Sequence, residues 1–396
     1  MRILVIPHQM SMGGSQINAI ELAAKVRDMG HHVVLYAPHG VLDPLVDEVG
    51  VPRIVKRTDA DLSPGSVRRL VDIVRRERID LIHAYEWGPS LEATFGPHLR
   101  FGVPVLMTVL SMVVDDFLPR HLPMTLSTRE MVDQRRAVHE RVLLTEPPID
   151  TDLNTAGDRA AARAVFGFED DEIVVTTVCR LTSDLEKLEG TLVALDVLGR
   201  LAHDRRVTMV IVGDGTGLDE VRRRADIVNA DHGRTVIHVT GQLLDPRPAY
   251  DAADVMIGMG SSALKGLAFG KPLVVQGEGG YWKLLTPDTV DEFLYAGWFG
   301  RGGRGAADFE PEIVRVLDDR ALRTELGVYG LELARRRYSL TVLASALESM
   351  YEDVLSSAPG REPRALARSA REVAKFLAYR VVHPSPVASS ADGRTA

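Results

Sequence analysis

The chain alternates short apolar runs with longer segments whose apolar residues recur at helical spacing. In the first half the apolar runs lie at 2–6, 31–38, 81–85 and 104–110, and helical patterns such as 66–80 separate them. Strands that alternate with helices at this spacing form right-handed βαβ units with a parallel sheet. The first half therefore predicts a doubly wound α/β domain.

A second series of apolar runs follows a polar segment. Residues 146–158, EPPIDTDLNTAGD, contain two prolines and are typical of a linker between domains. Beyond them come five runs rich in valine and isoleucine and bounded by glycine, at 172–181, 207–215, 236–241, 254–260 and 271–280. Runs of this kind predict a second parallel sheet that is buried on both faces.

The predicted architecture is two Rossmann-like, doubly wound parallel-sheet domains that face each other across a cleft. We expect an N-terminal domain over 1–150 and a C-terminal domain over 151–337. Residues 338–357 contain a long amphipathic pattern, which predicts a helix that crosses back to the N-terminal domain. The tail, 358–396, changes composition and is expected to be partly disordered. Two such domains favour a ligand between them, at the carboxyl ends of the strands.

Composition and charge narrow the class of protein. The chain is 45% hydrophobic, and no window approaches the roughly 18 uninterrupted apolar residues of a membrane-spanning helix. The apolar run at 2–6 is too short for a secretory signal, so we expect a soluble, cytoplasmic protein. A net charge of -8 argues against a nucleic-acid partner. A single cysteine, Cys179, excludes an internal disulfide, and its apolar surroundings favour a buried filler over a nucleophile.

The tail contains one more helical pattern, REVAKFLAYRVVH at 371–383. Its cations Arg371, Lys375 and Arg380 lie beside apolar residues, a combination that suits a membrane surface or a partner protein. The alternative, which we favour, is a helix that packs back on the body of the protein. Residues 384–396 are expected to be disordered.

Two cations follow the first strand of the second domain. Arg180 comes directly after VVTTVC, and Lys187 opens the helical pattern KLEGTLVAL. An arginine fork and a lysine point charge at a strand end suit a diphosphate. The SSAL turn, residues 261–264, would present free backbone N–H groups at a helix N-terminus to the same anion. For the arginine excess of the chain as a whole we favour genomic base composition as the explanation, and we keep a functional interpretation only for an arginine at a strand end.

Seven short motifs in order, taken together, resemble a known family. They are GG at 13–14, PPIDTD at 147–152, CRL at 179–181 with a downstream lysine, VIVGDGTGLDEV at 210–221, VTGQLLD at 239–245, AYDAADVMIGMG at 249–260 and KGLAFGKPLVV at 265–275. The chain resembles the retaining glycosyltransferases of family 4, which have the GT-B fold, over residues 1 to about 355. The resemblance implies transfer of a sugar from a nucleotide-diphosphate sugar to an acceptor hydroxyl, without a metal or a cofactor. It also implies that the C-terminal domain holds the donor and the N-terminal domain holds a small-molecule or glycan acceptor.

The same resemblance assigns roles to individual residues. Arg180 and Lys187 match the cationic clamp on the leaving diphosphate, and are the catalytic candidates. The remaining donor-binding candidates are Gly13, Gly14, Gly241, Gln242, Leu243, Ser261, Ser262, Ala263 and Leu264. Of these, the 241–243 loop is expected to read the base through its backbone.

The chain departs from the family pattern at three places. Lys265 stands where the family has a glutamate that accepts hydrogen bonds from the ribose, and an ammonium has no acceptor capacity. Lys265 is therefore expected to bind an additional phosphate or to form a salt bridge. Glu278 is a candidate to supply the missing carboxylate, and its alternatives are an exposed loop acid or a partner for Lys265. Leu110 replaces the histidine that the family places near the reacting sugar. The spacing from Arg180 to Lys187 is also two residues longer than usual.

Candidates for the acceptor side follow two strands of the first domain. Glu86 and Trp87 come after the strand 81–85 and could hold a polar acceptor by hydrogen bonding and ring stacking. Asp115 and Asp116 follow the strand that ends near Leu110. An ordinary surface position is an equally good interpretation of each of these residues.

Three hypotheses follow for the function. The first is a retaining glycosyltransferase. The second, favoured by Lys265 and Leu110, is a degenerate member of the fold that binds a nucleotide or supports an active partner. The third is a nucleotide-sugar epimerase of the same general fold, which the motif order disfavours.

Overall fold

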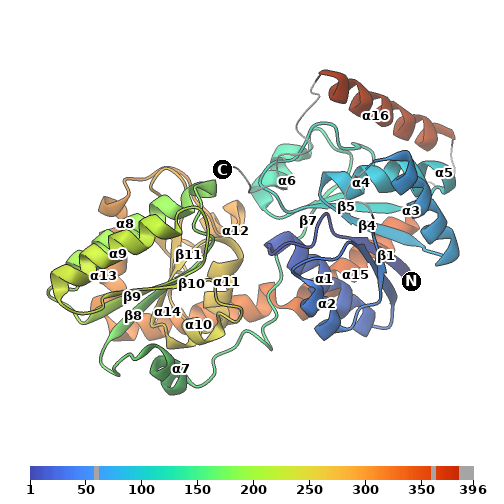
Figure 1. Cartoon of the computed structure of the whole chain (residues 1–396). Coiled ribbons are helices and arrows are strands. Elements are labelled where there is room, and N and C mark those ends of the chain that lie inside the picture. The colour runs from blue at the N-terminus through green and yellow to red at the C-terminus, as the bar shows by residue number, and fades with distance from the viewer. Residues whose placement is uncertain (58–61, 358–362, 383–396) are drawn as a thin grey trace. The chain divides into compact units, whose positions relative to one another are not determined.

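A computed structural model describes residues 1–57, 62–357 and 363–382. The chain divides into two compact units (Figure 1). Unit 1 consists of Met1–Pro147 together with the chain from Leu343 onward, and unit 2 consists of Pro148–Val342. The predicted disorder of 384–396 falls outside the described residues.

Unit 1 is built around a seven-stranded sheet. In chain order its elements are β1 (Arg2–Ile6), α1 (Gly14–Asp28), β2 (His32–Ala37), α2 (Asp43–Val49), β3 (Arg53–Val55), α3 (Pro64–Arg76), β4 (Leu81–Tyr85), α4 (Trp87–Ala93), the π-helical turn η1 (Thr94–His98), α5 (Leu99–Phe101), β5 (Val105–Val109), β6 (Met124–Leu126), α6 (Arg129–Arg135), β7 (Val142–Leu144), α15 (Leu340–Ser356) and α16 (Pro363–Val382). The strands are parallel, in the order β3-β2-β1-β4-β5-β6-β7. The chain order reverses between β1 and β4, which is where open α/β sheets bind ligands.

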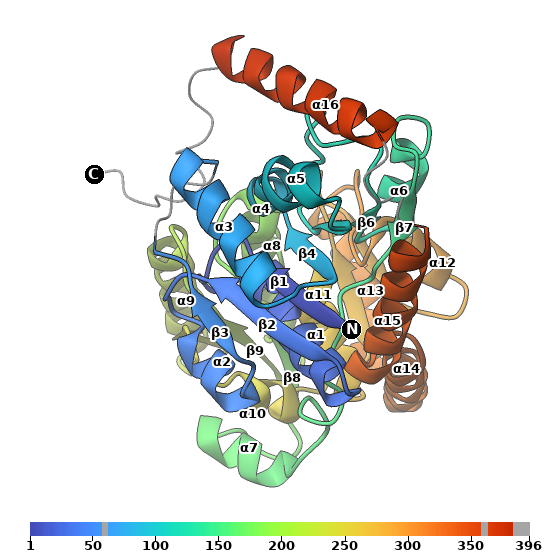
Figure 2. The same ribbon diagram turned by 90° about the vertical axis from the view of Figure 1, so that its right-hand side faces the viewer.

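Helices cover both faces of this sheet, with α1 and α15 on one face and α3 and α4 on the other (Figures 1 and 2). The alternation of side chains along β4 fits this arrangement. Ile82 joins the core cluster that includes Leu70 of α3, whereas His83 hydrogen-bonds to the hydroxyl of Tyr351 on α15 at 2.7 Å. The body of α15 therefore completes the core of unit 1.

Unit 2 repeats the plan with six strands. Its elements are α7 (Arg159–Phe166), β8 (Ile173–Val178), the short 3₁₀ turn η2 (Asp184–Glu186), α8 (Lys187–Leu201), β9 (Val207–Val212), α9 (Leu218–His232), β10 (Ile237–Gly241), α10 (Arg247–Ala252), β11 (Val255–Gly258), α11 (Gly260–Ala268), β12 (Leu273–Gln276), β13 (Trp282–Leu284), α12 (Val290–Ala296), α13 (Ala306–Asp318), α14 (Arg320–Leu333) and the π-helical turn η3 (Ala334–Tyr338). The strand order is β10-β9-β8-β11-β12-β13, and β13 alone among these runs antiparallel to its neighbour. The order reverses between β8 and β11, which predicts the ligand position in this unit.

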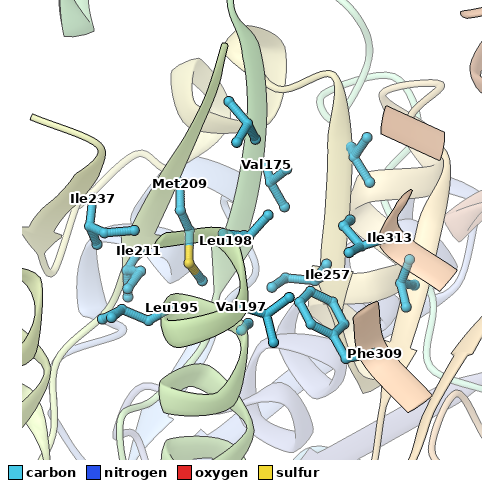
Figure 3. Packing of buried hydrophobic residues seen from close by; sticks show 14 of the residues in the cluster. Val175, Leu195, Val197, Leu198, Met209, Ile211, Ile237, Ile257, Phe309 and Ile313 are labelled. Atoms are coloured by element: carbon cyan, nitrogen blue, oxygen red, sulfur yellow. The ribbon is translucent and has the colours of Figure 1, made fainter. Parts of the chain in front are cut away.

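The larger core cluster of unit 2 lies between the sheet and the helices α8, α9 and α13. Val175 of β8 and Ile257 of β11 pack there with Leu198 of α8 and Phe309 of α13 (Figure 3). A second cluster packs α11 and η3 on the opposite face. Burial on both faces explains why the strands of this unit are continuous apolar runs. The prediction of two α/β domains with doubly wound parallel sheets is confirmed.

The tail helix α16 packs against unit 1. Phe376 is buried against the rings of Phe95 and Phe117. The hydroxyl of Ser369 forms a hydrogen bond with Nε2 of His121 at 2.9 Å. Leu377 faces outward and is exposed. Of the apolar residues that suggested a membrane surface, Phe376 is thus turned inward, Val373 is half-buried and Leu377 is exposed. In the described residues, no helix is both long enough and apolar enough to cross a membrane.

Candidate functional site

The candidate site of unit 2 lies at the carboxyl ends of β8 and β11, where the strand order reverses. Three segments meet the requirements for binding an anion there. They are the loop from β8 to α8, the adjoining pair of loops that follow β9 and β10, taken together as one segment, and the first turn of α11.

The loop after β8 brings its two cations to one carboxylate. Nζ of Lys187 donates a hydrogen bond to Oδ2 of Asp184, and Nη2 of Arg180 lies 3.6 Å from the same oxygen. The Lys187 side chain is only 15% exposed, whereas that of Arg180 is 68% exposed. The two predicted clamp residues therefore converge on a single anion, and Lys187 is the better shielded from water.

A buried glutamine holds the start of α8 in place. Nε2 of Gln276, at the end of β12, donates to the backbone oxygen of Glu186 at 2.9 Å and to that of Lys187 at 3.5 Å. The carboxylate of Glu186 in turn accepts a hydrogen bond from the N–H of Gly279 at 2.8 Å. These contacts connect the loop after β8 to the end of β12 and the loop that follows it. They thereby fix the position at which α8 begins, at Lys187.

The loops after β8, β9 and β10 are packed backbone against backbone. The N–H of Gly213 donates to the carbonyl of Gly241 at 2.9 Å, and a Cβ on Gly213 would lie 1.8 Å from the carbonyl oxygen of Cys179. Only glycine fits there, because its φ of 150° is also one that L side chains rarely adopt. Cys179 is itself packed into the core, and burial raises the pKa of its thiol, as expected for a filler.

The first turn of α11 presents backbone rather than side-chain groups. The hydroxyl of Ser262 donates to the carbonyl of Met259 at 3.2 Å, so it is engaged within the turn. Gly260 has a φ of 57° and its N–H donates to Trp298, which sets the entry into the helix. The first N–H groups of a helix have no acceptor within the helix, and in α11 these belong to Ser261, Ser262 and Ala263. An anion at this turn would be met by backbone donors.

Lys265 and Glu278 interact with different charged residues. Lys265, half-buried on α11, contributes to lowering the pKa of Asp245, although the hydrogen bond from Arg247 is the larger cause. The charge of Lys265 therefore acts on Asp245, in the segment that follows β10. Glu278 instead lies 3.9 Å from Arg301, so its alternative as a partner for Lys265 finds no support.

In unit 1 the corresponding strand ends are organised by Glu86. Its Oε1 accepts hydrogen bonds from the N–H groups of Leu110 and Ser111 at 3.0 and 3.2 Å and from the hydroxyl of Ser15 at 3.2 Å. Its Oε2 accepts from the hydroxyl of Ser111 at 2.9 Å. The buried carboxylate therefore joins the loops after β4 and β5 to the start of α1. These contacts use much of the hydrogen-bonding capacity of the Glu86 carboxylate. We had expected this carboxylate to be available to bind the acceptor substrate.

The other acceptor-side candidates separate into different environments. Trp87 packs edge-on against Phe117, with ring centroids 5.9 Å apart, and belongs to the margin of the core rather than to an open stacking surface. Asp116 pairs with Arg135 at 2.7 Å, and this hydrogen bond lowers its pKa. Burial raises the pKa of Asp115, and the nearby charges of Glu86 and Asp116 raise it further. Asp115 is thus the candidate that lies near Glu86.

Gly13 and Gly14 form the start of a helix rather than a free loop. Gly13 is the N-cap of α1, with an extended backbone at φ −176°, and Gly14 is the first helical residue. The N–H groups of this first turn lie at the carboxyl end of β1, beside Ser15 and its contact with Glu86.

Comparison with known proteins identifies the family. Residues 12–142 match the family model described as Glycosyltransferase Family 4, and residues 172–319 match the one described as Glycosyl transferases group 1. The chain is a member of the family 4 glycosyltransferases. These matches fall one in each unit.

Curated relatives of this glycosyltransferase are D-inositol 3-phosphate glycosyltransferases. The protein from Geodermatophilus obscurus is 29% identical over 264 residues, which cover 61% of this chain and 55% of the relative. The protein from Kribbella flavida is 25% identical over 385 residues, covering 82% of this chain and 87% of the relative. In the first of these alignments the chain spans about half the length of the relative it matches.

Solved structures share the fold of this glycosyltransferase. A glycosyltransferase from Rickettsia africae superposes with a TM-score of 0.72 at 15% identity, over 90% of this chain and 99% of the other. Anabaena HepE in complex with UDP superposes with a TM-score of 0.71 at 15% identity, over 89% and 100%. At this identity the likeness establishes the fold alone.

Two features of the glycosyltransferase lie at the opposite edge of the unit 2 sheet. A hollow of about 710 Å³ is lined by the amino-end residues Ile173, Asp254 and Lys271, among others. His203 and His232, which with Asp231 could hold a metal ion, lie at the C-terminal ends of α8 and α9. Since ligands of doubly wound sheets bind at the carboxyl ends, neither feature belongs to the candidate site.

Sequence reasoning missed three residues that shape the site: Asp184, Glu186 and Gln276. Gln276 carried a weak signal, because an amide at the end of the apolar strand LVVQ must find partners when buried. Asp184 and Glu186 looked like ordinary loop acids between the two cations.

Proposed function

We propose that this glycosyltransferase moves a sugar from a nucleotide-diphosphate sugar to an acceptor hydroxyl with retention of configuration. The observation that carries the proposal is the convergence of Arg180 and Lys187 on one anion at the reversal point of the unit 2 sheet. Next to them in the sheet, the first turn of α11 offers backbone donors of the kind that bind phosphate.

The proposed mechanism stabilises the leaving group. The anomeric C–O bond of the donor breaks through an oxocarbenium-like transition state, and negative charge develops on the departing diphosphate. Lys187 and Arg180 neutralise this charge, and the N–H groups of 261–263 donate to it. Lys187 is the stronger contributor in this scheme, because charge interactions weaken with exposure to water. No protein nucleophile is required.

The proposed acceptor site is the carboxyl edge of unit 1 around Glu86, Asp115 and the start of α1. The curated relatives act on D-inositol 3-phosphate, so this polyol phosphate and unphosphorylated inositol are the first acceptors to compare. The acidic side chains Glu86 and Asp115 favour a neutral hydroxyl compound over a phosphorylated one, since like charges repel.

A second function, nucleotide binding without transfer, is favoured by specific observations. Lys265 replaces a carboxylate that would grip the ribose, and Glu278 is drawn toward Arg301 rather than toward Lys265. Leu110 contributes only its backbone N–H, which Glu86 already accepts. A chain with this chemistry would bind a nucleotide and support a partner.

A ligand panel separates these functions. The full chain and a Lys187→Met variant are titrated with UDP, GDP, ADP, CDP and dTDP and their common sugars, with the unfolding temperature as the readout. A ligand present at about 100 times its Kd stabilises the folded state by about 2.7 kcal/mol. We expect one base to stabilise the wild type and to lose most of that effect in the variant. Enzyme-dependent transfer or hydrolysis of that donor then supports the transferase, and its absence supports the binding function. No stabilisation across the panel contradicts both.

A further inference from the structure

Arg180 and Lys187 share a carboxylate that the proposed mechanism does not use. Oδ2 of Asp184 accepts a hydrogen bond from Nζ of Lys187 and lies 3.6 Å from Nη2 of Arg180. The hydroxyl of Thr182 donates to the other oxygen, Oδ1. Both oxygens of Asp184 are therefore engaged, Oδ2 by the same two cations that are proposed to hold the donor diphosphate.

The backbone that follows Asp184 is strained and firmly held. Leu185 and Glu186 have φ values of 54° and 52°, a left-handed conformation that is unfavourable for residues with a side chain. Such a conformation persists only where neighbours enforce it, and here Gln276 at the end of β12 and Gly279 in the loop after it hold Glu186. The position of Asp184 between the cations is consequently built into the loop.

The charge state of Asp184 is also set by its neighbours. Burial alone would raise the pKa of Asp184, but hydrogen bonds from Lys187 and Thr182 and the charges of Lys187 and Arg180 outweigh it, so that the pKa lies below its ordinary value. Asp184 is therefore an anion at neutral pH. A diphosphate arriving at the two cations must displace this carboxylate or lie next to it, and either outcome weakens binding.

We propose that Asp184 is a built-in competitor for the diphosphate group: it occupies the cationic clamp of the free protein, weakens binding of the nucleoside diphosphate and thereby favours product release. This inference rests on the donor site proposed above. The ligand it concerns is any diphosphate anion, whether carried by a nucleoside or free as pyrophosphate. Asp184 acts on affinity and touches no reacting atom.

The test removes the charge of Asp184 and keeps its shape. In Asp184→Asn the amide oxygen takes the place of Oδ2 and still accepts from Lys187, and the amide N–H₂ takes the place of Oδ1 and donates to the Thr182 hydroxyl, which can turn to accept, so the loop keeps both contacts. Kd values for inorganic pyrophosphate and for UDP are measured by calorimetry on the full chain. We expect Asp184→Asn to bind pyrophosphate about fivefold to tenfold more tightly than the wild type. Asp288→Asn removes the same charge from an exposed position after β13 and should change Kd less than about twofold.

The outcomes separate this inference from the proposed function. If Asp184→Asn binds pyrophosphate more tightly and neither protein binds any nucleoside diphosphate, competition by Asp184 is supported and the proposed donor site is rejected. If both proteins bind UDP and the Kd of Asp184→Asn is unchanged or higher, Asp184 is not a competitor, and the donor site remains supported. Failure of both proteins to bind pyrophosphate would also overturn the inference. Asp184→Ser, which shortens the side chain as well, serves in place of the asparagine variant if the latter unfolds at lower temperature than the wild type.

Discussion

The two units reverse their strand order in the same way, yet the chemistry at the two reversal points is opposite. In unit 2 the loops present cations and backbone N–H groups at the carboxyl edge of the sheet, and Asp184 is the carboxylate that the cations meet. In unit 1 the loops turn inward on Glu86, whose oxygens accept hydrogen bonds from Ser15, Leu110 and Ser111. One topology thus supports an anion site in one unit and a satisfied acid in the other, because the loops alone decide the charge.

The largest expected effect contrasts Gly213, directly after β9 in unit 2, with Gly13, the N-cap of α1 in unit 1. Gly213→Ala should lower the free energy of unfolding by about 3 to 5 kcal/mol, because the added Cβ would meet the Cys179 carbonyl at 1.8 Å with φ at 150°. Gly13→Ala should cost less, about 1 kcal/mol, since its backbone is extended and the added Cβ would meet the terminal Oε1 of Gln16 at 2.4 Å rather than a backbone atom. Urea unfolding of both variants measures the difference, and equal midpoints would contradict the close packing of the unit 2 loops.

The next effect concerns the cations of unit 2. Lys187→Met should lower kcat/KM for the donor sugar by about 30- to 100-fold, because Lys187 is largely shielded from water. Arg180→Ala should lower it by only about five- to tenfold, since the guanidinium is 68% exposed. Steady-state kinetics at constant ionic strength give both ratios. A larger loss for Arg180 than for Lys187 would mean that the diphosphate lies on the outer side of the loop.

Substitutions of Glu86 in unit 1 and of Glu278 in unit 2 should lower the free energy of unfolding by different amounts. Glu86→Gln should lower the free energy of unfolding by about 1 to 3 kcal/mol, because an amide N–H₂ would face donors at Leu110 and Ser111. Glu278→Gln, at a partly exposed loop position, should stay within about 0.5 kcal/mol of the wild type. Chemical denaturation measures both. Unchanged donor affinity in Glu278→Gln would also end its role as the missing ribose ligand.

The smallest effect is a pH dependence under α16. Burial lowers the pKa of His121 and of His139 to about 4, from an ordinary value of 6.5. His98, Arg368 and Glu372 face His121, and Arg135, Arg120, Asp116 and Glu372 face His139. Because the unfolded chain binds more protons between pH 4 and 6.5, the stability that these neutral histidines contribute is complete above pH 6.5 and is lost as the pH falls toward 4.

We therefore expect the free energy of unfolding to fall by about 1 kcal/mol more between pH 7.5 and pH 5 in the wild type than in a His121→Gln, His139→Gln double variant. Hydrogen exchange along α16 should rise over the same range in the wild type. The exposed His203→Gln substitution in unit 2 is the matched control. An identical pH profile for the double variant and the wild type would exclude these two groups as the cause.

Much of the fold could be predicted, and the misses have a common cause. The predicted strand 81–85 coincides with β4, and the other predicted runs of four or more residues each contain an observed strand. β3, β6, β7 and β13 were not predicted, because each has only three residues and no periodicity can be recognised over that length. The tail helix also begins earlier than 371, at Pro363, where polar residues hide its start.

The residues of the candidate site likewise include some that could be predicted from sequence and some that could not. Arg180 could be selected from sequence because a cation that closely follows an apolar strand lies at the carboxyl edge of a parallel sheet, and Lys187 because the helix after that strand begins at the same edge. The role of Gln276 could not, since its partners Glu186 and Lys187 precede it by 90 and 89 residues. The engagement of Glu86 likewise depends on Ser15 and on the loop at 110–111, which only the folded sheet brings to it.

By itself the amino-acid sequence determined the alternation of strands and helices, the division into two Rossmann-like units and the edge at which charged residues collect. These properties follow from local periodicity and from the handedness of βαβ connections, both of which are written in contiguous residues. Only the tertiary structure decided which charges meet: that Asp184 lies between Arg180 and Lys187, and that Glu86 is satisfied from within. The physical reason is that a hydrogen bond or an ion pair acts over a few ångströms, and the distances between loops are set by the packing of the whole sheet.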